Sequence, residues 1–199
     1  MHVRSTAAGL EVLAPAKLNL FLEVLGKRDD GFHEIETLMY PIGLYDTLIF
    51  EDDPGGQLSL TCQQAGARQP HFTASASLAD LRPAGEMSVA GELLPAGADN
   101  LVVRAVDLVR RRLGVQRGAR LQLTKRIPMA AGLAGGSSDA AAALVAANQV
   151  WRLGLAGHEL AALAGELGSD IPFFVQRSSG ECAPAVCRGR GEIIQPVDR

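Results

Sequence analysis

Residues 128–140 read Pro-Met-Ala-Ala-Gly-Leu-Ala-Gly-Gly-Ser-Ser-Asp-Ala, and an alanine-rich run follows at Ala140–Asn148. The stretch passes from a proline through three glycines into two serines. Because glycine has no Cβ, a glycine-rich backbone can approach an oxyanion closely. Two serines and an aspartate suit a helix N-terminus, where free N–H groups and the macrodipole attract negative charge. The stretch therefore predicts a loop that binds a nucleotide phosphate, and the alternative is a glycine-rich turn that only starts a helix.

Spacing excludes two common phosphate-binding loops. The Walker A loop places Gly-Lys-Ser/Thr after its glycines, whereas Gly136 is followed directly by Ser137. The dinucleotide loop has the pattern Gly-x-Gly-x-x-Gly, which Gly132, Gly135 and Gly136 do not fit. The stretch belongs to neither class, so the rest of the chain has to decide between its two interpretations.

Composition narrows the class of protein. Apolar residues make up 47% of the 199 residues, enough for the core of one large domain, and the net charge is −3. We therefore expect no nucleic-acid partner. No segment reaches the ~18 continuous apolar residues of a membrane span, and the N-terminus has no signal-peptide pattern. We expect a cytoplasmic protein with no membrane partner.

The cysteines and histidines predict no zinc site. Cys62, Cys182 and Cys187 form no Cys-x-x-Cys pair, and the four histidines lack metal-ligand spacing. We interpret the three cysteines as buried or idle thiols. The one basic cluster, Arg110–Arg112, fits the C-terminus of a helix better than an RNA site.

The predicted elements are strands first, then helices and strands mixed. Asn100–Leu113 has the apolar periodicity of a helix, another helix follows the glycine-rich loop to about Trp151, and Gly168 ends a short helix at His158–Leu167. The predicted extended segments are 12–25, 33–40, 47–51, 58–61, 86–89, 120–125, 173–176, 181–186 and 192–196, the last three as closing strands or turns. This order predicts an α+β fold.

Residues 12–25 alternate as a half-buried strand does. One face carries the apolar residues Leu18, Leu20, Leu22 and Val24. The opposite face holds Lys17 beside Asn19. We expect the apolar face to pack in the core; for Lys17 taken alone, an ordinary solvated lysine is the alternative.

Three segments carry a resemblance to a known family. They are Pro15-Ala-Lys-Leu-Asn-Leu-Phe-Leu22, the stretch 128–140, and Leu167-Gly-Ser-Asp-Ile-Pro-Phe-Phe174. In this order they resemble the GHMP kinases, which include galactokinase, homoserine kinase and mevalonate kinase. Lys17-Leu-Asn19 with Gly31-Phe-His33 resembles, more narrowly, the 4-diphosphocytidyl-2-C-methyl-D-erythritol kinases of the non-mevalonate isoprenoid pathway. The resemblance covers residues 12–51 and 99–197.

The resemblance implies a fold and a domain organisation. The fold is the GHMP kinase N-terminal domain, of the ribosomal protein S5 domain 2-like type, with a mixed sheet and helices packed on one side. Residues 1–199 would form this single ATP-binding domain, because nothing in the chain resembles the C-terminal domain of the family. A face that the second domain normally covers leaves apolar side chains exposed, so self-association is expected as well.

The resemblance also implies a reaction. The γ-phosphate of ATP moves, with Mg²⁺, to the 2-hydroxyl of a small-molecule substrate, 4-diphosphocytidyl-2-C-methyl-D-erythritol. Asp170 is implied as the catalytic base or as the group that orients the acceptor hydroxyl. Lys17 is implied as the second catalytic residue, which steadies the charge on the transferring phosphoryl group. Taken alone, Asp170 could instead shape a turn.

Binding residues follow from the same resemblance. Asn100 and Lys125 are implied on the adenosine side of ATP, and Ser137 or Ser138 could also reach Mg²⁺. The phosphate cradle comprises Pro128, Met129, Ala130, Ala131, Gly132, Leu133, Ala134, Gly135, Gly136, Ser137 and Ser138. The implied substrate-binding residues are Asn19, Phe32 stacked on cytosine and His33 hydrogen-bonded to it. The alternatives are a helix N-cap for Asn100, a core position for Phe32 and an idle surface histidine for His33.

The chain departs from the family pattern in ways that leave two function classes. Ala130, Ala131 and Ala134 stand where glycine is common, and each adds a Cβ that could crowd a phosphate or oppose positive φ. Phe32 stands where tyrosine is usual, which keeps the stacking face and loses the hydroxyl. The first class is an ATP-dependent kinase, and the second is a non-catalytic or truncated nucleotide-binding module.

Overall fold

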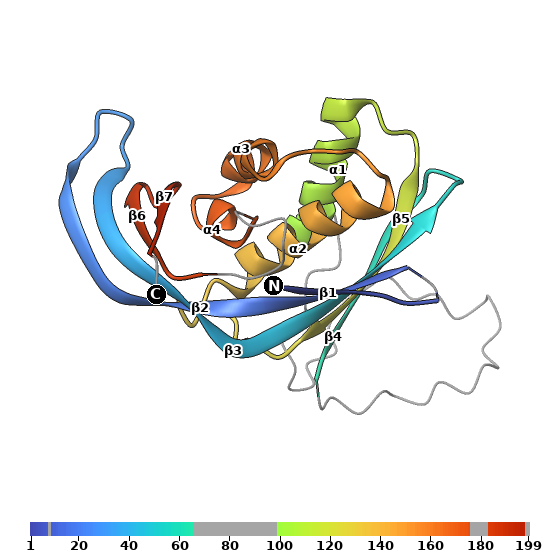
Figure 1. Cartoon of the computed structure of the whole chain (residues 1–199), viewed down its shortest axis with the longest axis horizontal. Helices are drawn as coiled ribbons and strands as arrows, with labels where there is room; N and C mark the ends of the chain where they lie inside the picture. The colour runs from blue at the N-terminus through green and yellow to red at the C-terminus, as the bar shows by residue number, and fades with distance from the viewer. Residues whose placement is uncertain (8, 66–98, 176–182, 198–199) are drawn as a thin grey trace, which may run out of the picture.

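A computed structural model of the chain describes residues 1–7, 9–65, 99–175 and 183–197. In this part of the chain one mixed sheet is covered on one face by helices (Figure 1). The strands are β1 (His2–Ser5), β2 (Leu10–Lys27), β3 (His33–Asp53), β4 (Leu58–Gln64), β5 (Gly118–Lys125), β6 (Ala185–Gly189) and β7 (Ile193–Pro196). Their order is β1-β2-β3-β5-β4, with β6 paired to β3 and β7 paired to β6. Only β4 and β5 pair in parallel among the described strands, so the predicted mixed sheet is confirmed.

The helices are α1 (Leu101–Leu113), α2 (Gly135–Val150), α3 (Gly157–Leu167) and α4 (Ile171–Val175). The sequence explains α1 well. Its predicted apolar stripe is buried, the Asn100 side chain accepts the Val102 N–H at 2.8 Å, and Gly114 ends the helix in the left-handed conformation. Arg110–Arg112 occupy its last turn, as predicted.

Helix α2 forms the centre of the core. Every residue from Ser138 to Ala147 is buried, and the helix contacts β2, β3 and each of the other three helices. The run of alanines allows this close approach because a methyl side chain adds little width to a helix. The position of α2 fixes the glycine-rich stretch at the edge of the core, since that stretch leads directly into its first turn.

The predicted burial of the apolar face of β2 is wrong beyond Ala16. Val12, Ala14 and Ala16 are fully buried, whereas every residue from Leu18 to Lys27 is exposed. Here β2 and β3 form a long curved hairpin that extends past the helical layer (Figure 1). Irregular register between Asn19 and Phe21 and between Val24 and Gly26 also breaks the alternation. The predicted self-association, which these exposed side chains would favour, remains a prediction.

The remaining predicted elements are confirmed only in part. Residues 173–176 were expected to be a strand or turn, but the structure has helix α4 at Ile171–Val175. The ring centroids of Phe173 and Phe174 in this helix are 5.1 Å apart. Strand β7 confirms the closing segment 192–196 and β4 confirms 58–61, whereas β6 overlaps the predicted 181–186 only at Ala185 and Val186 and continues to Gly189. The predicted strand at 86–89, Cys182 and the beginning of 181–186 lie outside the described residues. No helix in the described part of the chain is long and apolar enough to cross a membrane.

Candidate active site

The glycine-rich stretch forms the connection between β5 and α2. Its backbone φ is positive at Ala130 (54°), Gly132 (72°) and Ala134 (54°), a conformation that is easy for glycine and strained for alanine. Helix α2 starts at Gly135, earlier than predicted, so Gly136 and Ser137 belong to its first turn. First-turn N–H groups lack intrahelical partners, so this end of α2 offers donors to an anion.

The two neighbouring glycines have different roles. An ideal Cβ on Gly135 would lie 2.9 Å from Cγ2 of Ile127 and 3.2 Å from Nζ of Lys125, closer than side chains pack. The corresponding atom on Gly136 would meet only Leu101, at 3.8 Å. Gly135 therefore lets α2 approach the end of β5, while Gly136 leaves space beside the loop.

A cavity of about 440 Å³ lies along this loop. It is bounded by the loop itself, the first turn of α2, the end of β5 and the residues before α1. Every predicted ATP-binding residue lines it except Leu133 and Ser138. Asn100 caps α1, which confirms its structural interpretation; it also lines the cavity, and its role on the adenosine side remains a prediction.

The two serines proposed for Mg²⁺ are placed differently. Ser137 lines the cavity. Ser138 is fully buried, and its Oγ has no hydrogen-bond partner among the described residues. Within those residues, no group of three or more His, Cys, Asp or Glu side chains is arranged to hold a metal ion. Cys62 is half-buried, and Cys187 is buried with its Sγ 3.8 Å from the carbonyl oxygen of Ala185.

Lys125 sits between two buried carboxylates. Its Nζ donates to Oδ2 of Asp46 and, at 2.5 Å, to Oδ2 of Asp139. Oδ1 of Asp46 accepts the backbone N–H groups of Arg126 and, at 2.9 Å, Ile127. Asp46, Lys125 and Asp139 thus connect β3 with the end of β5, just before the glycine-rich stretch, and with the first turns of α2.

Electrostatics in this buried group oppose full ionisation. Burial raises the pKa of Asp139 to about 7, although Lys125 partly lowers it, and Oδ1 of Asp139 has no hydrogen-bond partner among the described residues. Burial lowers the pKa of Lys125, but its ion pairs with both carboxylates outweigh this effect and leave the pKa above its ordinary value.

Lys17 and Asp170 meet where the phosphate loop touches β2. Nζ of Lys17 lies 3.4 Å from Oδ2 of Asp170 and donates to Oδ1 of Asn19 at 3.1 Å. The Lys17 backbone N–H donates to the carbonyl of Leu133 in the loop at 3.1 Å. The Lys17 side chain is only 5% exposed, whereas that of Asp170 is 33% exposed. The solvated-lysine alternative is therefore wrong, and the pair is open to a ligand on its carboxylate side.

Asp170 owes its position to a tight turn between two helices. Gly168 ends α3 with its N–H on the carbonyl of Ala164, and the Ile171 N–H that opens α4 donates to the carbonyl of Gly168. Asp170 does belong to a turn, as its alternative interpretation had it, and the turn directs its carboxylate toward Lys17.

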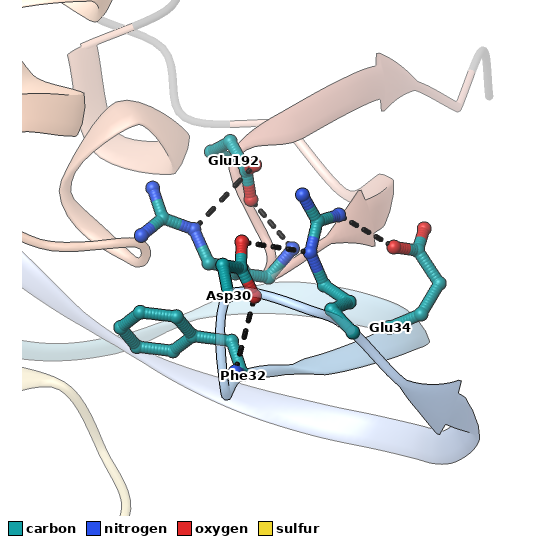
Figure 2. Close-up of polar contacts among 6 residues, drawn as sticks. Asp30, Phe32, Glu34 and Glu192 are labelled. Atoms are coloured by element: carbon teal, nitrogen blue, oxygen red, sulfur yellow. Dashed lines mark hydrogen bonds and ion pairs between the residues drawn. The ribbon is translucent and has the colours of Figure 1, made fainter.

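Phe32 and His33 lie at the turn of the β2–β3 hairpin. Phe32 is 51% exposed, so the core alternative is wrong, and His33 is exposed as well. Figure 2 shows the polar cluster around them: Asp30 accepts the Phe32 backbone N–H at 3.1 Å, and Arg28 pairs with Asp30 and Glu34. The Phe32 N–H, and then Arg28, lower the pKa of Asp30. This cluster holds the hairpin turn in one conformation.

Residues 100–178 match the family model described as the GHMP kinases N terminal domain. The chain has the fold of the GHMP kinase N-terminal domain. The match contains Asn100, the glycine-rich loop and Asp170, so it includes most of the cavity lining and one half of the Lys17–Asp170 pair; Cys62, Asp99 and Lys17 lie outside it. The α+β fold with helices on one face, expected from the resemblance, is confirmed.

Similar proteins extend the match over most of the chain. A 4-diphosphocytidyl-2-C-methyl-D-erythritol kinase of Synechococcus sp. (strain CC9902) is 43% identical over 189 residues, which is 94% of this chain and 51% of the relative. The enzyme of that name from Pelotomaculum thermopropionicum is 42% identical over 186 residues, with 54% of its length covered. The chain spans about half the length of the curated relatives it matches.

Two solved structures have a fold similar to that of this chain. A crystal structure of 4-(cytidine 5'-diphospho)-2C-methyl-D-erythritol kinase superimposes with a TM-score of 0.64 and 36% identity, over 94% of this chain and 55% of that one. A homoserine kinase from Cytophaga hutchinsonii, at 18% identity and a TM-score of 0.58, shares the fold.

Sequence reasoning missed two parts of the site. Asp46 was not singled out, although it is a lone carboxylate within the largely apolar stretch 41–50, a setting that demands a buried partner. Arg190, whose Cζ lies 4.8 Å from the centroid of the Phe32 ring, was not singled out either. No sequence pattern signals that contact, because strand pairing between β3 and β6 brings the two segments together.

Proposed function

We propose that the chain is the ATP-binding domain of a kinase that transfers the γ-phosphate of ATP to the 2-hydroxyl of 4-diphosphocytidyl-2-C-methyl-D-erythritol. One observation carries the proposal: Lys17 pairs with Asp170 through its side chain and bonds to the phosphate loop through its backbone. A catalytic pair is thereby attached to a nucleotide cavity. ATP in the cavity would present its terminal phosphate near the pair, and the reaction would belong in the cytoplasm.

The transfer step uses the residues of this pair. The Asp170 carboxylate accepts the proton of the acceptor hydroxyl as its oxygen bonds to the γ-phosphorus, and the bond from that phosphorus to the bridging oxygen of ADP breaks. The Lys17 ammonium stabilises the negative charge on the transferring oxygens. Asn19 fixes the Lys17 side chain by accepting its hydrogen bond. Phosphoryl transfer depends on positioning and charge, and these three residues supply both.

The residues of the cavity fit a nucleoside triphosphate. Gly136 leaves space beside the loop, the first turn of α2 offers backbone donors, and about 440 Å³ suits a ligand of this size. Mg²⁺ would neutralise phosphate charge there, and Ser137, on the cavity wall, is the better placed of the two serine candidates.

The acceptor side rests on the hairpin. Phe32 offers a half-exposed aromatic ring and His33 an exposed imidazole next to it, which together suit a nucleobase. A mevalonate or homoserine acceptor has no base for these residues to bind. The relatives named above, at 42–43% identity, carry the name of the cytidyl enzyme and support this choice of acceptor.

The decisive experiment is a coupled ADP-release assay of the 199-residue chain with Mg·ATP, with and without the cytidyl acceptor. Acceptor-dependent release supports the proposal, and release with mevalonate or homoserine instead overturns the choice of acceptor. Calorimetric titration with ATP runs in parallel. ATP binding without release favours the second candidate, a non-catalytic nucleotide-binding module, which the strained Ala130 and Ala134 also favour. Neither binding nor release overturns both.

A further inference from the structure

The turn between β6 and β7 lies between Asp170 and the Phe32 side chain. An ideal Cβ on Gly191 would be 3.7 Å from Oδ1 of Asp170 and 3.8 Å from the carbonyl of Ser169, so this turn adjoins the catalytic pair. Arg190, which precedes Gly191, places its guanidinium carbon 4.8 Å from the centroid of the Phe32 ring. The turn therefore spans the space from Asp170 to the aromatic side chain on the hairpin.

The backbone of this turn is fixed, while the Arg190 guanidinium has donors to spare. Glu192 accepts the Arg190 backbone N–H at 2.6 Å (Figure 2). Gly189 and Gly191, on either side of Arg190, adopt positive φ. The guanidinium itself has a single ion pair among the described residues, from Nε to Glu192 at 3.7 Å. An arginine carries five N–H donors, so most of them can serve a ligand.

Arg28, the other arginine of the cluster, is a useful contrast. It donates to Asp30 at 3.1 Å and to Glu34 at 2.7 Å, so two carboxylates already engage it. Its role is to hold the hairpin turn. Of these two arginines, Arg190 contacts Phe32, lies next to Asp170 through its neighbour Gly191, and has guanidinium donors that no described residue engages.

We propose that Arg190 binds the diphosphate of a nucleoside-diphosphate acceptor. The inference rests on the proposed function: if the base lies on Phe32 and the acceptor hydroxyl reaches Asp170, the diphosphate that joins them passes the β6–β7 turn. Arginine matches phosphate oxygens with paired N–H donors, and its contact with the Phe32 ring fixes the guanidinium beside the base. Arg190 is thereby the residue that distinguishes a nucleoside diphosphate from a nucleoside.

The rival explanation is that Arg190 only covers the Phe32 ring. The two differ in their effect on ligands with and without phosphate, and CDP and cytidine provide that comparison. Calorimetric titration of the 199-residue chain with each ligand requires neither ATP nor transfer, so the test stands even if the chain proves inactive. Arg190→Ala is the main variant, and Arg190→Lys restores the charge without the paired donors. Arg188→Ala is the matched control, because Arg188 lies in the same hairpin and pairs with Glu36 and Gln195.

We expect Arg190→Ala to weaken CDP binding about tenfold or more while cytidine binding stays within about twofold. Arg190→Lys should recover part of the lost CDP affinity, and Arg188→Ala should change the affinity for neither CDP nor cytidine. Equal losses for CDP and cytidine, or no loss for either, would overturn the proposal. A wild-type chain that binds CDP no better than cytidine would overturn it as well. A failure of transfer with these binding differences intact would count against the kinase and leave the diphosphate site standing.

Discussion

Nζ of Lys17 lies 3.4 Å from Oδ2 of Asp170, and the backbone N–H of the same lysine donates to Leu133 in the phosphate loop. A single residue of β2 thus connects the Asp170 carboxylate with the glycine-rich loop. In the proposed reaction the γ-phosphoryl group has to reach both the loop and the acceptor, so this connection would set where transfer occurs. It also makes the roles of the two residues separable by mutation.

Asp170→Asn should lower the rate of phosphoryl transfer by a factor of about 100 or more, because the amide cannot accept the acceptor proton. ATP affinity should stay within about twofold, since Asp170 does not line the nucleotide cavity. Steady-state ADP release and ATP calorimetry measure the two effects. Glu166→Gln is the control, because Glu166 is a half-exposed carboxylate on α3 that pairs with Arg112. Loss of ATP binding in a folded Asp170→Asn variant would count against the base role.

Gly135→Ala should destabilise the chain by about 1–3 kcal/mol, because its Cβ would overlap Ile127 and press on Lys125. Gly136→Ala makes the matched comparison: its Cβ meets ordinary contact distances, and alanine favours a helix by up to about 1 kcal/mol. Urea unfolding of both variants gives the difference in free energy of unfolding. Equal effects at the two positions would show that close approach of α2 to β5 does not depend on Gly135.

The sequence predicted what local patterns encode and missed what tertiary contacts decide. The motif around Lys17, the glycine-rich loop and Asp170 predicted three pieces of one site, and the structure brings them into contact. Alternation alone predicted a buried face for Leu18–Val24. It failed because burial depends on where the helical layer ends, which no residue of β2 determines. The pairing of Asp46 with Lys125 likewise joins residues distant in sequence.

Ala134→Gly should stabilise the chain. Ala134 has φ 54° and ψ 32°, where a Cβ adds strain of about 1–2 kcal/mol. Glycine removes the strain but gives the unfolded chain more freedom, which takes back about 0.4–1 kcal/mol. The expected net gain is therefore about 1 kcal/mol or less in thermal or urea unfolding. Ala162→Gly, at an exposed position inside α3, should instead destabilise by about 1 kcal/mol. Destabilisation by both substitutions would mean that Ala134 is unstrained.

Asp46→Ala should be among the most damaging single changes in the chain. It leaves Lys125 with one carboxylate and removes the acceptor for the backbone N–H groups of Arg126 and Ile127. Breaking a buried ion pair by removing one partner costs about 3–5 kcal/mol. Glu51→Ala, on the same strand, removes a pair with Arg120, whose side chain is 58% exposed, and should cost less, about 1 kcal/mol. Comparable midpoints in urea for the two variants would show that the buried group is not what holds the loop.

Asp139 should make stability depend on pH. Burial raises its pKa from 3.8 to about 7, so the folded chain keeps this proton up to about pH 7, whereas the unfolded chain releases it near pH 4. Between these values the folded state binds more protons, and the contribution of Asp139 to the free energy of unfolding falls as the pH rises. The slope is at most about 1.4 kcal/mol per pH unit, and it levels off above the folded pKa.

Asp139→Asn isolates this contribution because the amide oxygen can still accept the Lys125 hydrogen bond but carries no titratable proton. Urea unfolding of both proteins at pH 5, 6, 7 and 8 gives the difference between wild type and variant at each pH. We expect the wild type to lose stability relative to the variant from pH 5 to pH 7 and to change little from pH 7 to pH 8. A difference that is constant across this range would show that Asp139 is ionised throughout, with Lys125 fully compensating its burial.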